Sequence, residues 1–100
     1  MEFWNISLKD ALIMANDGEN YQLIDVREPY RYEKDHLKGA LNRPYGILKE
    51  SDQFEEKSLI VYCDFGGQSM MAARHLEKEG YQVYNIVGGV YYYLSDKKDS

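Results

Sequence analysis

Three short, largely apolar runs recur along the chain, at residues 23–26, 59–62 and 83–87. Each run is too short and too continuous for a half-exposed helix, in which apolar residues return at every third or fourth position. Continuous apolar runs of this length are typical of strands that are buried on both faces of a parallel sheet. The pattern therefore predicts three buried strands.

Apolar residues at helical spacing lie before the first of these runs and after the second. The two sets are Leu8, Ala11, Leu12 and Ala15, and Ser69, Ala72, Ala73 and Leu76. They predict helices from about residue 8 to 15 and from about 69 to 79. Ser7 and Asp10 have the spacing of a capping pair, and Gly80 stands where a left-handed residue is expected after a helix. Strands that alternate with helices, without hairpin turns, predict an α/β fold with a parallel sheet covered on both faces.

The composition indicates a single globular domain, because 100 residues with 44% hydrophobic content supply one core and are too few for two. Residues 43–46 are predicted to be irregular, since Pro44 disfavours helix in the residue before it. The polar tail at residues 95–100 is predicted to be frayed.

The charge narrows the class of partner. The 17 acidic residues outnumber the 12 basic ones, the net charge is -5, and the sequence has no basic block. A nucleic acid or an anionic membrane is therefore not expected as the primary partner. Small molecules or proteins are expected instead.

Cysteine content and the first residues bear on location. A single Cys cannot form an internal disulfide, and residues 1–10 have neither the basic start nor the apolar stretch of a signal peptide. No run approaches the roughly 20 apolar residues of a membrane helix. A cytoplasmic location is therefore expected. One Cys and two separated His do not supply a ligand set, so no metal site and no cofactor are predicted.

The only cysteine, Cys63, lies in the stretch YCDFGGQS at the predicted carboxyl end of the second buried strand. Open α/β sheets bind ligands at this edge. Gly66 and Gly67 permit backbone angles that turn successive N–H groups inward, and the helix that begins near Ser69 adds its own unpaired N–H groups. Such a cradle binds an anion and would favour the thiolate form of Cys63, which is the nucleophilic form.

A second interpretation of Cys63 stays open at this point. Free cysteine is among the most buried residue types, and a single Cys at a strand end is often a small apolar filler. The two glycines and the helix start that follow it are features that a filler would not need. The loop alone does not identify a reaction.

Five segments in a fixed order resemble a single-domain rhodanese, a sulfurtransferase of the thiosulfate type. They are Asp25-Val26-Arg27-Glu28, His36-Leu37-Lys38-Gly39-Ala40 with Asn42 and Pro44, Cys63 to Ser69, Ala72-Ala73 with Leu76 and Gly80, and Val87-Gly88-Gly89. The resemblance runs from about Trp4 to Leu94. It implies one three-layer α/β/α domain around a five-stranded parallel sheet, with the additional strands near Trp4 and near residues 40–43.

The resemblance also implies a chemistry. Cys63 takes a sulfane sulfur from thiosulfate or a persulfide donor as a persulfide, and passes it to cyanide or a thiol acceptor, which can belong to a protein. The backbone of Asp64, Phe65, Gly66, Gly67, Gln68 and Ser69 forms the cradle. The resemblance extends to phosphatases and arsenate reductases, whose cysteine loop is longer and ends in Arg. This chain has Ser69 at that position, so phosphatase activity is not expected.

Two residues of the loop depart from many family members, and both concern charge. Gln68 stands where Arg is frequent, and its neutral side chain removes a cation that would help to bind thiosulfate. Asp64 would repel an anionic donor if it pointed inward, and it is predicted to point to solvent. We expect a persulfide to be the better donor and thiosulfate a poor one. The alternative to a transferase is a catalytically weak rhodanese-like module that binds or regulates a protein.

Two further groups have two interpretations each. The resemblance places Asp25 and Arg27 near the rim of the site. The structural alternative is favoured slightly: Asp25 caps local backbone, and Arg27 forms a surface ion pair of little energetic value. The run of residues 91–93 is three tyrosines, which can form a docking surface or alternate between core and solvent. The resemblance implies that this run begins a short helix beside the Cys63 loop, with one ring lining the pocket.

Overall fold

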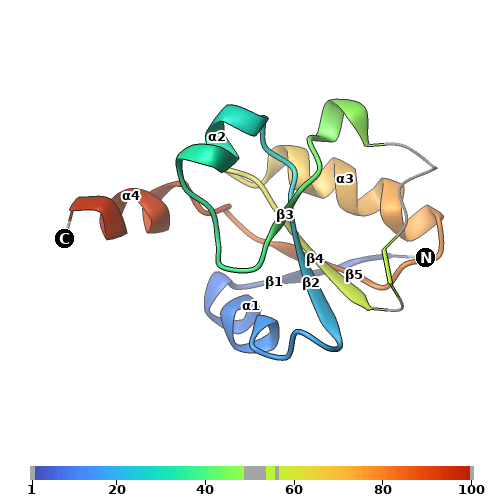
Figure 1. Ribbon diagram of the computed structural model, residues 1–100. Helices are drawn as coiled ribbons and strands as arrows, with labels where there is room; N and C mark the ends of the chain where they lie inside the picture. Colours follow the sequence, from blue (N-terminus) through green and yellow to red (C-terminus); the bar gives the residue numbers. More distant parts are fainter. Residues whose placement is uncertain (1, 49–53, 56, 100) are drawn as a thin grey trace.

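A five-stranded, all-parallel sheet forms the centre of the domain (Figure 1). The computed structural model describes residues 2–48, 54–55 and 57–99. The strands are β1 (Trp4–Ile6), β2 (Tyr21–Asp25), β3 (Leu41–Asn42), β4 (Ser58–Tyr62) and β5 (Val83–Ile86), in the order β1-β5-β4-β2-β3. The three strands predicted from apolar runs are therefore confirmed, as are the two that the resemblance implied. The fold is the predicted α/β class.

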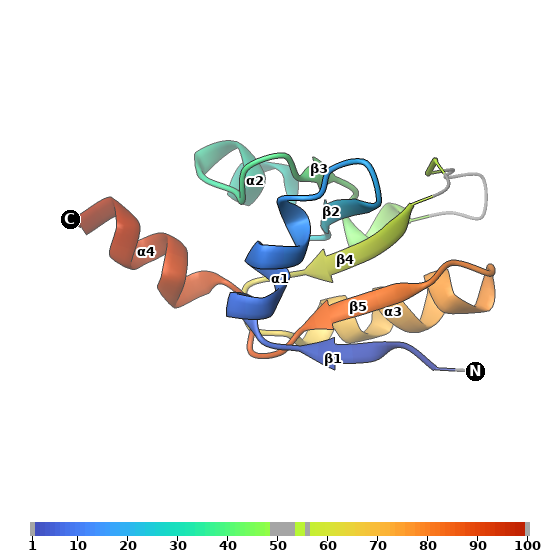
Figure 2. The ribbon, with the colours of Figure 1, turned by 90° about the horizontal axis from the view of Figure 1, so that it is seen from below.

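Helices cover both faces of this sheet (Figures 1 and 2). They are α1 (Leu8–Ala15), α2 (Pro29–Lys34), α3 (Gly67–Lys78) and α4 (Tyr91–Asp99), with a 3-10 turn, η1 (Tyr45–Ile47). The bounds of α1 match the prediction, and the Ser7 side chain accepts a hydrogen bond from the Asp10 N–H at 3.0 Å. Helix α3 begins before the predicted start at Ser69, because Gly66 adopts φ of 100° and acts as its N-cap. Gly80, with φ of 99°, is left-handed as predicted.

The alternation of side chains along β4 divides the core between the two faces of the sheet. Leu59 and Val61 pack in a cluster with Cys63 and the inner face of α3. Ile60 and Tyr62 point the other way, into a cluster that includes residues of α1 and α4. All five of these residues are buried. The cysteine therefore belongs to the α3 face of the core and lies one residue beyond the end of β4.

Three segments differ from the predictions. Helix α2 was not predicted, although Pro29 at its first turn is a common helix start. Part of residues 43–46, predicted to be irregular, enters η1. Residues 95–99 of the tail, predicted to be frayed, continue α4, and residue 100 lies outside the described residues.

The carboxyl ends of the parallel strands share one edge of the sheet, and α4 extends outward from that edge (Figure 2). The segments that follow β2, β4 and β5 begin at this edge with Val26, Cys63 and Val87. The topology therefore brings α2, the cysteine loop and the start of α4 together. Within the residues described, no helix is long and apolar enough to cross a lipid bilayer.

Candidate functional site

Cys63 lies between the end of β4 and the start of α3, with only 4% of its surface exposed. Two backbone N–H groups point at its sulfur. The Gly66 nitrogen lies 3.0 Å from Sγ and the Ser69 nitrogen 3.4 Å from it. Both N–H groups belong to the first turn or the cap of α3, which adds the positive end of the helix dipole. The arrangement can stabilise negative charge on the sulfur.

The hydroxyl of Ser69 is the side-chain partner of this sulfur. Its Oγ lies 3.5 Å from Sγ, and the hydroxyl donates to the carbonyl of Gly66 at 3.2 Å. With its one proton used in that way, the Ser69 oxygen accepts from the thiol of Cys63. If the thiol ionises, the hydroxyl can turn toward the sulfur and become a third donor. Of the six predicted cradle residues, the structure brings Gly66 and Ser69 into hydrogen-bond contact with Sγ.

The turn between β5 and α4 supports the cysteine loop from outside. The N–H groups of Val90 and Tyr91 donate to the carbonyls of Cys63 and Asp64, each at 3.0 Å. Gly89, with φ of 75°, lies against the backbone of Asp64 so closely that a Cβ would overlap it. The loop after β4 is therefore fixed by hydrogen bonds to a second loop.

The structure contradicts the prediction that Asp64 points to solvent. Its carboxylate turns toward two arginines, with Oδ1 3.1 Å from Nη1 of Arg27 and Oδ2 2.8 Å from Nη2 of Arg31. Nε of Arg31 also donates to Oδ2 at 2.9 Å. The Asp64 side chain is 19% exposed. Sequence position alone could not show these contacts, because the partners lie in the segment after β2.

Asp25 and Arg27 form a buried pair at the carboxyl end of β2. Nε and Nη2 of Arg27 donate to the Asp25 carboxylate at distances from 2.8 to 3.1 Å, and the Arg27 backbone N–H donates to Oδ1 at 2.9 Å. The prediction that Asp25 caps local backbone is thus confirmed, whereas the prediction of a surface ion pair is wrong: Asp25 is 0% and Arg27 4% exposed. Burial alone would lower the pKa of Arg27, but the hydrogen bonds and charge of Asp25, together with Asp64, raise it above its usual value.

A pocket of about 370 Å³ opens beside Cys63. Its lining comes from the cysteine loop and from the residues at and before the start of α2. It is formed by Arg27, Glu28, Tyr30, Arg31, Cys63, Asp64, Phe65, Gly67 and Gln68. Thus Arg27, placed at the rim by resemblance, does line the pocket, and Gln68 also lies on it. Arg31, Glu28 and Tyr30 were missed as lining residues, although Glu28 belongs to a segment that carries the family resemblance.

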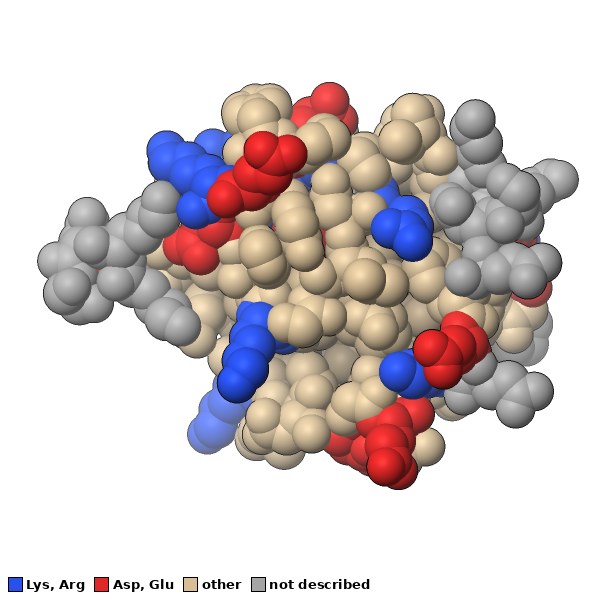
Figure 3. Space-filling view, in the orientation of Figure 1, with Lys and Arg blue, Asp and Glu red and all other residues tan. Residues whose placement is uncertain are grey.

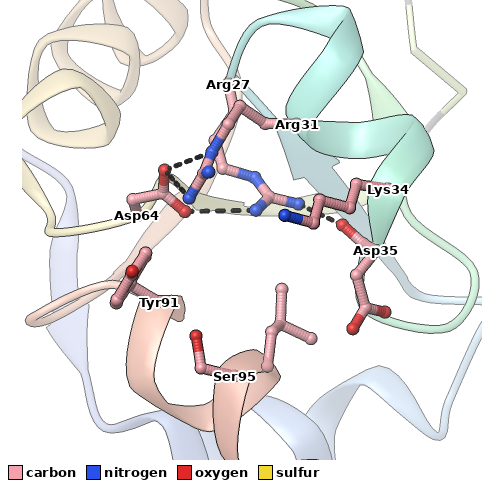
Figure 4. A pocket seen from close by; sticks show the side chains of 8 residues that line it. Arg27, Arg31, Lys34, Asp35, Asp64, Tyr91 and Ser95 are labelled. Carbon is pink, nitrogen blue, oxygen red and sulfur yellow. Dashed lines mark hydrogen bonds and ion pairs between the residues drawn. The ribbon is translucent and has the colours of Figure 1, made fainter. Parts of the chain in front are cut away.

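A second pocket, of about 110 Å³, adjoins the first on the side of α4 (Figure 4). Arg27, Arg31 and Asp64 line both pockets. Tyr91 lines the second one, where the Arg31 guanidinium lies 5.5 Å from the centre of its ring. The tyrosine run begins a helix beside the loop, as expected, but Tyr91 lines this adjoining pocket and not the pocket that contains Cys63. Acidic and basic side chains lie interspersed on the face shown in Figure 3.

Comparison with known protein families gives a match over most of the chain. The rhodanese-like domain family matches residues 8–96. The chain belongs to this family, whose members include sulfurtransferases.

Three relatives illustrate the range of proteins in which such a domain occurs. The candidate sulfur carrier YrkF of Bacillus subtilis is 35% identical over 88 residues, covering 85% of this chain and 48% of YrkF. The thiosulfate sulfurtransferase GlpE of Coxiella burnetii is 32% identical over 92 residues, covering 89% of this chain and 78% of GlpE. The crystal structure of reduced CoADR-RHD from Bacillus anthracis has a TM-score of 0.81 and 29% identity, covering 91% of this chain and 16% of that chain. This chain therefore spans about half the length of YrkF and a small part of CoADR-RHD.

Proposed function

We propose that this domain is a sulfurtransferase in which Cys63 carries sulfane sulfur as a persulfide. The observation that supports this most directly is the pair of N–H groups, from Gly66 and Ser69, at 3.0 and 3.4 Å from Sγ. A sulfur carrier must stabilise negative charge at this position twice, first on the attacking thiolate and then on the bound persulfide. Fixed backbone donors at the start of a helix do so without a neighbouring general base.

The proposed cycle consists of two displacements at sulfur. In the first, the Cys63 thiolate attacks the outer sulfur of thiosulfate; the new S–S bond forms as the S–S bond of thiosulfate breaks, and sulfite leaves with the bonding electron pair. In the second, cyanide or a thiolate attacks the terminal sulfur of the persulfide. The Cys63 thiolate is then the leaving group, and thiocyanate or a new persulfide is the product. A persulfide donor enters the same first step with a thiolate as leaving group.

Each predicted residue has a place in this proposal. Cys63 is the nucleophile, and the backbone from Asp64 to Ser69 forms the anion cradle. Arg27 lines the substrate pocket, whereas Asp25 acts behind it by holding Arg27. The substrates are a small sulfur donor and a thiol acceptor, the acceptor being a small molecule or a protein; we propose no metal or cofactor and no nucleic acid or membrane partner. A cytoplasmic location would keep the thiol reduced.

Intact-protein mass spectrometry tests this function. The reduced chain is incubated with thiosulfate, or with a low-molecular-weight persulfide, beside the Cys63→Ser variant. The expected result is a gain of the mass of one sulfur atom that cyanide then removes, absent from the variant. Absence of loading from both donors, with Cys63 still open to alkylation, would contradict the proposal.

The burial of Cys63 favours one second candidate, a rhodanese-like module that binds or regulates a protein. With 4% of its surface exposed, the cysteine offers little area to a donor. The aromatic side chains near it are more open: Phe65 is 62% and Tyr92 70% exposed, with ring centroids 6.2 Å apart. An unreactive but alkylatable Cys63 would favour this candidate over the transferase.

A further inference from the structure

The carboxylate of Asp64 forms ion pairs with the two arginines that border the cysteine pocket, Arg27 and Arg31. We infer that Asp64 selects against dianionic sulfur donors, such as thiosulfate, by taking the place of their anionic group on Arg27 and Arg31. This inference rests on the proposed sulfur transfer at Cys63. Asp64 determines specificity when the donor binds, before the sulfur transfer, and takes no part in the reaction itself.

The two arginines are well placed to bind an anion. Both line the pocket that also contains Cys63. Guanidinium groups bind carboxylate and oxyanion groups through paired N–H donors. Without a carboxylate at position 64, these donors would be the cations nearest to the anionic end of a donor that enters the pocket.

Counting hydrogen-bond donors shows how fully Arg27 is used. Of the five N–H donors of a guanidinium group, these contacts use four: Nε and one on Nη2 serve Asp25, the other on Nη2 serves the carbonyl of Asp35 at 2.6 Å, and one on Nη1 serves Asp64. Asp25 lies behind Arg27 and is fully buried, so the pocket side of Arg27 is held by Asp64. On Arg31, Nε and Nη2 both contact Oδ2 of Asp64 (Figure 4).

The charges of the cluster cancel. Arg27 and Arg31 contribute two positive charges, and Asp25 and Asp64 two negative ones. Glu28 adds a further carboxylate to the pocket lining, and Gln68 adds no charge. A dianion must therefore either displace Asp64 from its ion pairs or bind where the local charge is not positive. The affinity for a donor of lower charge is reduced less, because its binding depends less on these arginines.

A direct binding measurement tests the inference without any sulfur transfer. Sulfate, an unreactive dianion, is titrated into the wild-type protein and into Asp64→Asn while NMR follows the Nε–Hε signal of Arg31. We expect sulfate to bind Asp64→Asn at least about tenfold more tightly and to shift the Arg31 signal. Asp35→Asn is the matched control, since it removes the same charge from the edge of the second pocket, where the Asp35 carboxylate points away from both guanidinium groups (Figure 4).

Kinetics supplies the second measurement. Thiosulfate is compared with methanethiosulfonate, a monoanion that transfers its outer sulfur with methanesulfinate as leaving group. Asp64→Asn should raise kcat/KM for thiosulfate about tenfold relative to methanethiosulfonate. Adding Arg31→Gln to Asp64→Asn should remove most of this gain, because it deletes the freed cation.

The outcomes separate the two proposals. The role of Asp64 would be overturned if Asp35→Asn and Asp64→Asn gained sulfate affinity equally. It would also be overturned if a folded Asp64→Asn bound sulfate no more tightly than the wild type. Tighter sulfate binding by Asp64→Asn in a protein that transfers no sulfur would support that role and contradict the transferase function. If Asp64→Asn does not fold, Asp64→Ser takes its place, since it also removes the carboxylate: tighter sulfate binding than in the wild type supports the inference, and unchanged binding overturns it.

Discussion

Gly89 lies so close to the carbonyl group of Asp64 that its α-carbon has no room for a side chain. Its φ of 75° is also one that residues other than glycine rarely adopt. On either side of this contact, the turn after β5 binds the carbonyls of Cys63 and Asp64 through the N–H groups of Val90 and Tyr91. The turn between β5 and α4 thus packs against the outside of the cysteine loop and holds it by hydrogen bonds.

Gly89→Ala should therefore damage both stability and sulfur loading. The added methyl group must displace the backbone of Asp64, so we expect a loss of about 2 kcal/mol or more in the free energy of unfolding. A displaced loop misaligns the N–H groups at Sγ, and the rate of persulfide formation should fall at least about tenfold. Urea unfolding and timed mass spectrometry measure the two effects.

Gly18→Ala is the matched control for that experiment. Apart from its two chain neighbours, no described residue has an atom within 4 Å of a Cβ at Gly18, and the φ of Gly18 is not positive. We expect a change within about 0.5 kcal/mol and normal sulfur loading. Equal effects of the two substitutions would show that the close approach at Gly89 does not support the loop.

The sequence contains the local features of this fold in a form that simple rules recognise. The buried strands appear as continuous apolar runs, and α1 as a capped helical pattern ending at Ala15. The loop from Cys63 to Ser69 could be predicted as an anion cradle, because its glycines and the helix that follows are adjacent in sequence. Each of these features depends on neighbouring residues.

The charge environment of the site could not be predicted, because it depends on distant residues. Asp64 meets Arg27 and Arg31 across separations of 37 and 33 residues. A carboxylate beside a cysteine can point outward or inward, and only packing of the segment after β2 against the loop decides which. Helix α2 was missed for a related reason: its six residues are too few to show helical periodicity, and none of them is buried.

Arg27 is expected to be essential for stability, because it neutralises a fully buried carboxylate. In Arg27→Met, Asp25 would remain in the core without its partner, at a cost of about 3–5 kcal/mol in the free energy of unfolding. Adding Asp25→Asn should restore part of that loss, since it removes the unpaired charge. Chemical denaturation measures both.

The control for Arg27 is Arg74→Met, on the exposed face of α3. It removes a positive charge from the same protein without leaving a buried carboxylate, so its effect should stay within about 0.5 kcal/mol. If Arg27→Met were as mild as Arg74→Met, the buried pair would contribute nothing to folding.

Tyr62 should make the protein sensitive to alkaline pH. Burial, followed by the charge of Asp25, raises the pKa of its phenol well above the ordinary value of 10.0. The contribution of the buried Tyr62 phenol to the free energy of unfolding is fully present below pH 10, where the phenol is neutral in both the folded and the unfolded chain. Above that pH the unfolded chain releases the proton and the folded chain keeps it, so stability falls as the pH rises.

Tyr62→Phe separates this effect from others. Over the range above pH 10, the free energy of unfolding of the wild type should fall more steeply than that of the variant, by up to about 1.4 kcal/mol per pH unit. At neutral pH the variant should be less stable by about 1–3 kcal/mol, because the Leu37 N–H, 3.1 Å from the phenol oxygen, loses its acceptor. Urea titrations at several pH values give both quantities, with Tyr30→Phe as the control for an exposed phenol. Parallel pH profiles for wild type and Tyr62→Phe would show that this phenol does not govern alkaline stability.

Gln68 offers a way to add a further cation to the pocket lining without touching the ion pairs of Asp64. Its side chain is exposed on the lining of the cysteine pocket. Gln68→Arg should therefore raise kcat/KM for thiosulfate about tenfold, while Gln68→Met, of similar length and no charge, should not. The gain should shrink as salt is added, because an exposed cation is screened. A gain of equal size in both variants would mean that the shape of the side chain at position 68, and not its charge, limits the use of thiosulfate. The electrostatic explanation of donor choice would then be wrong for this position.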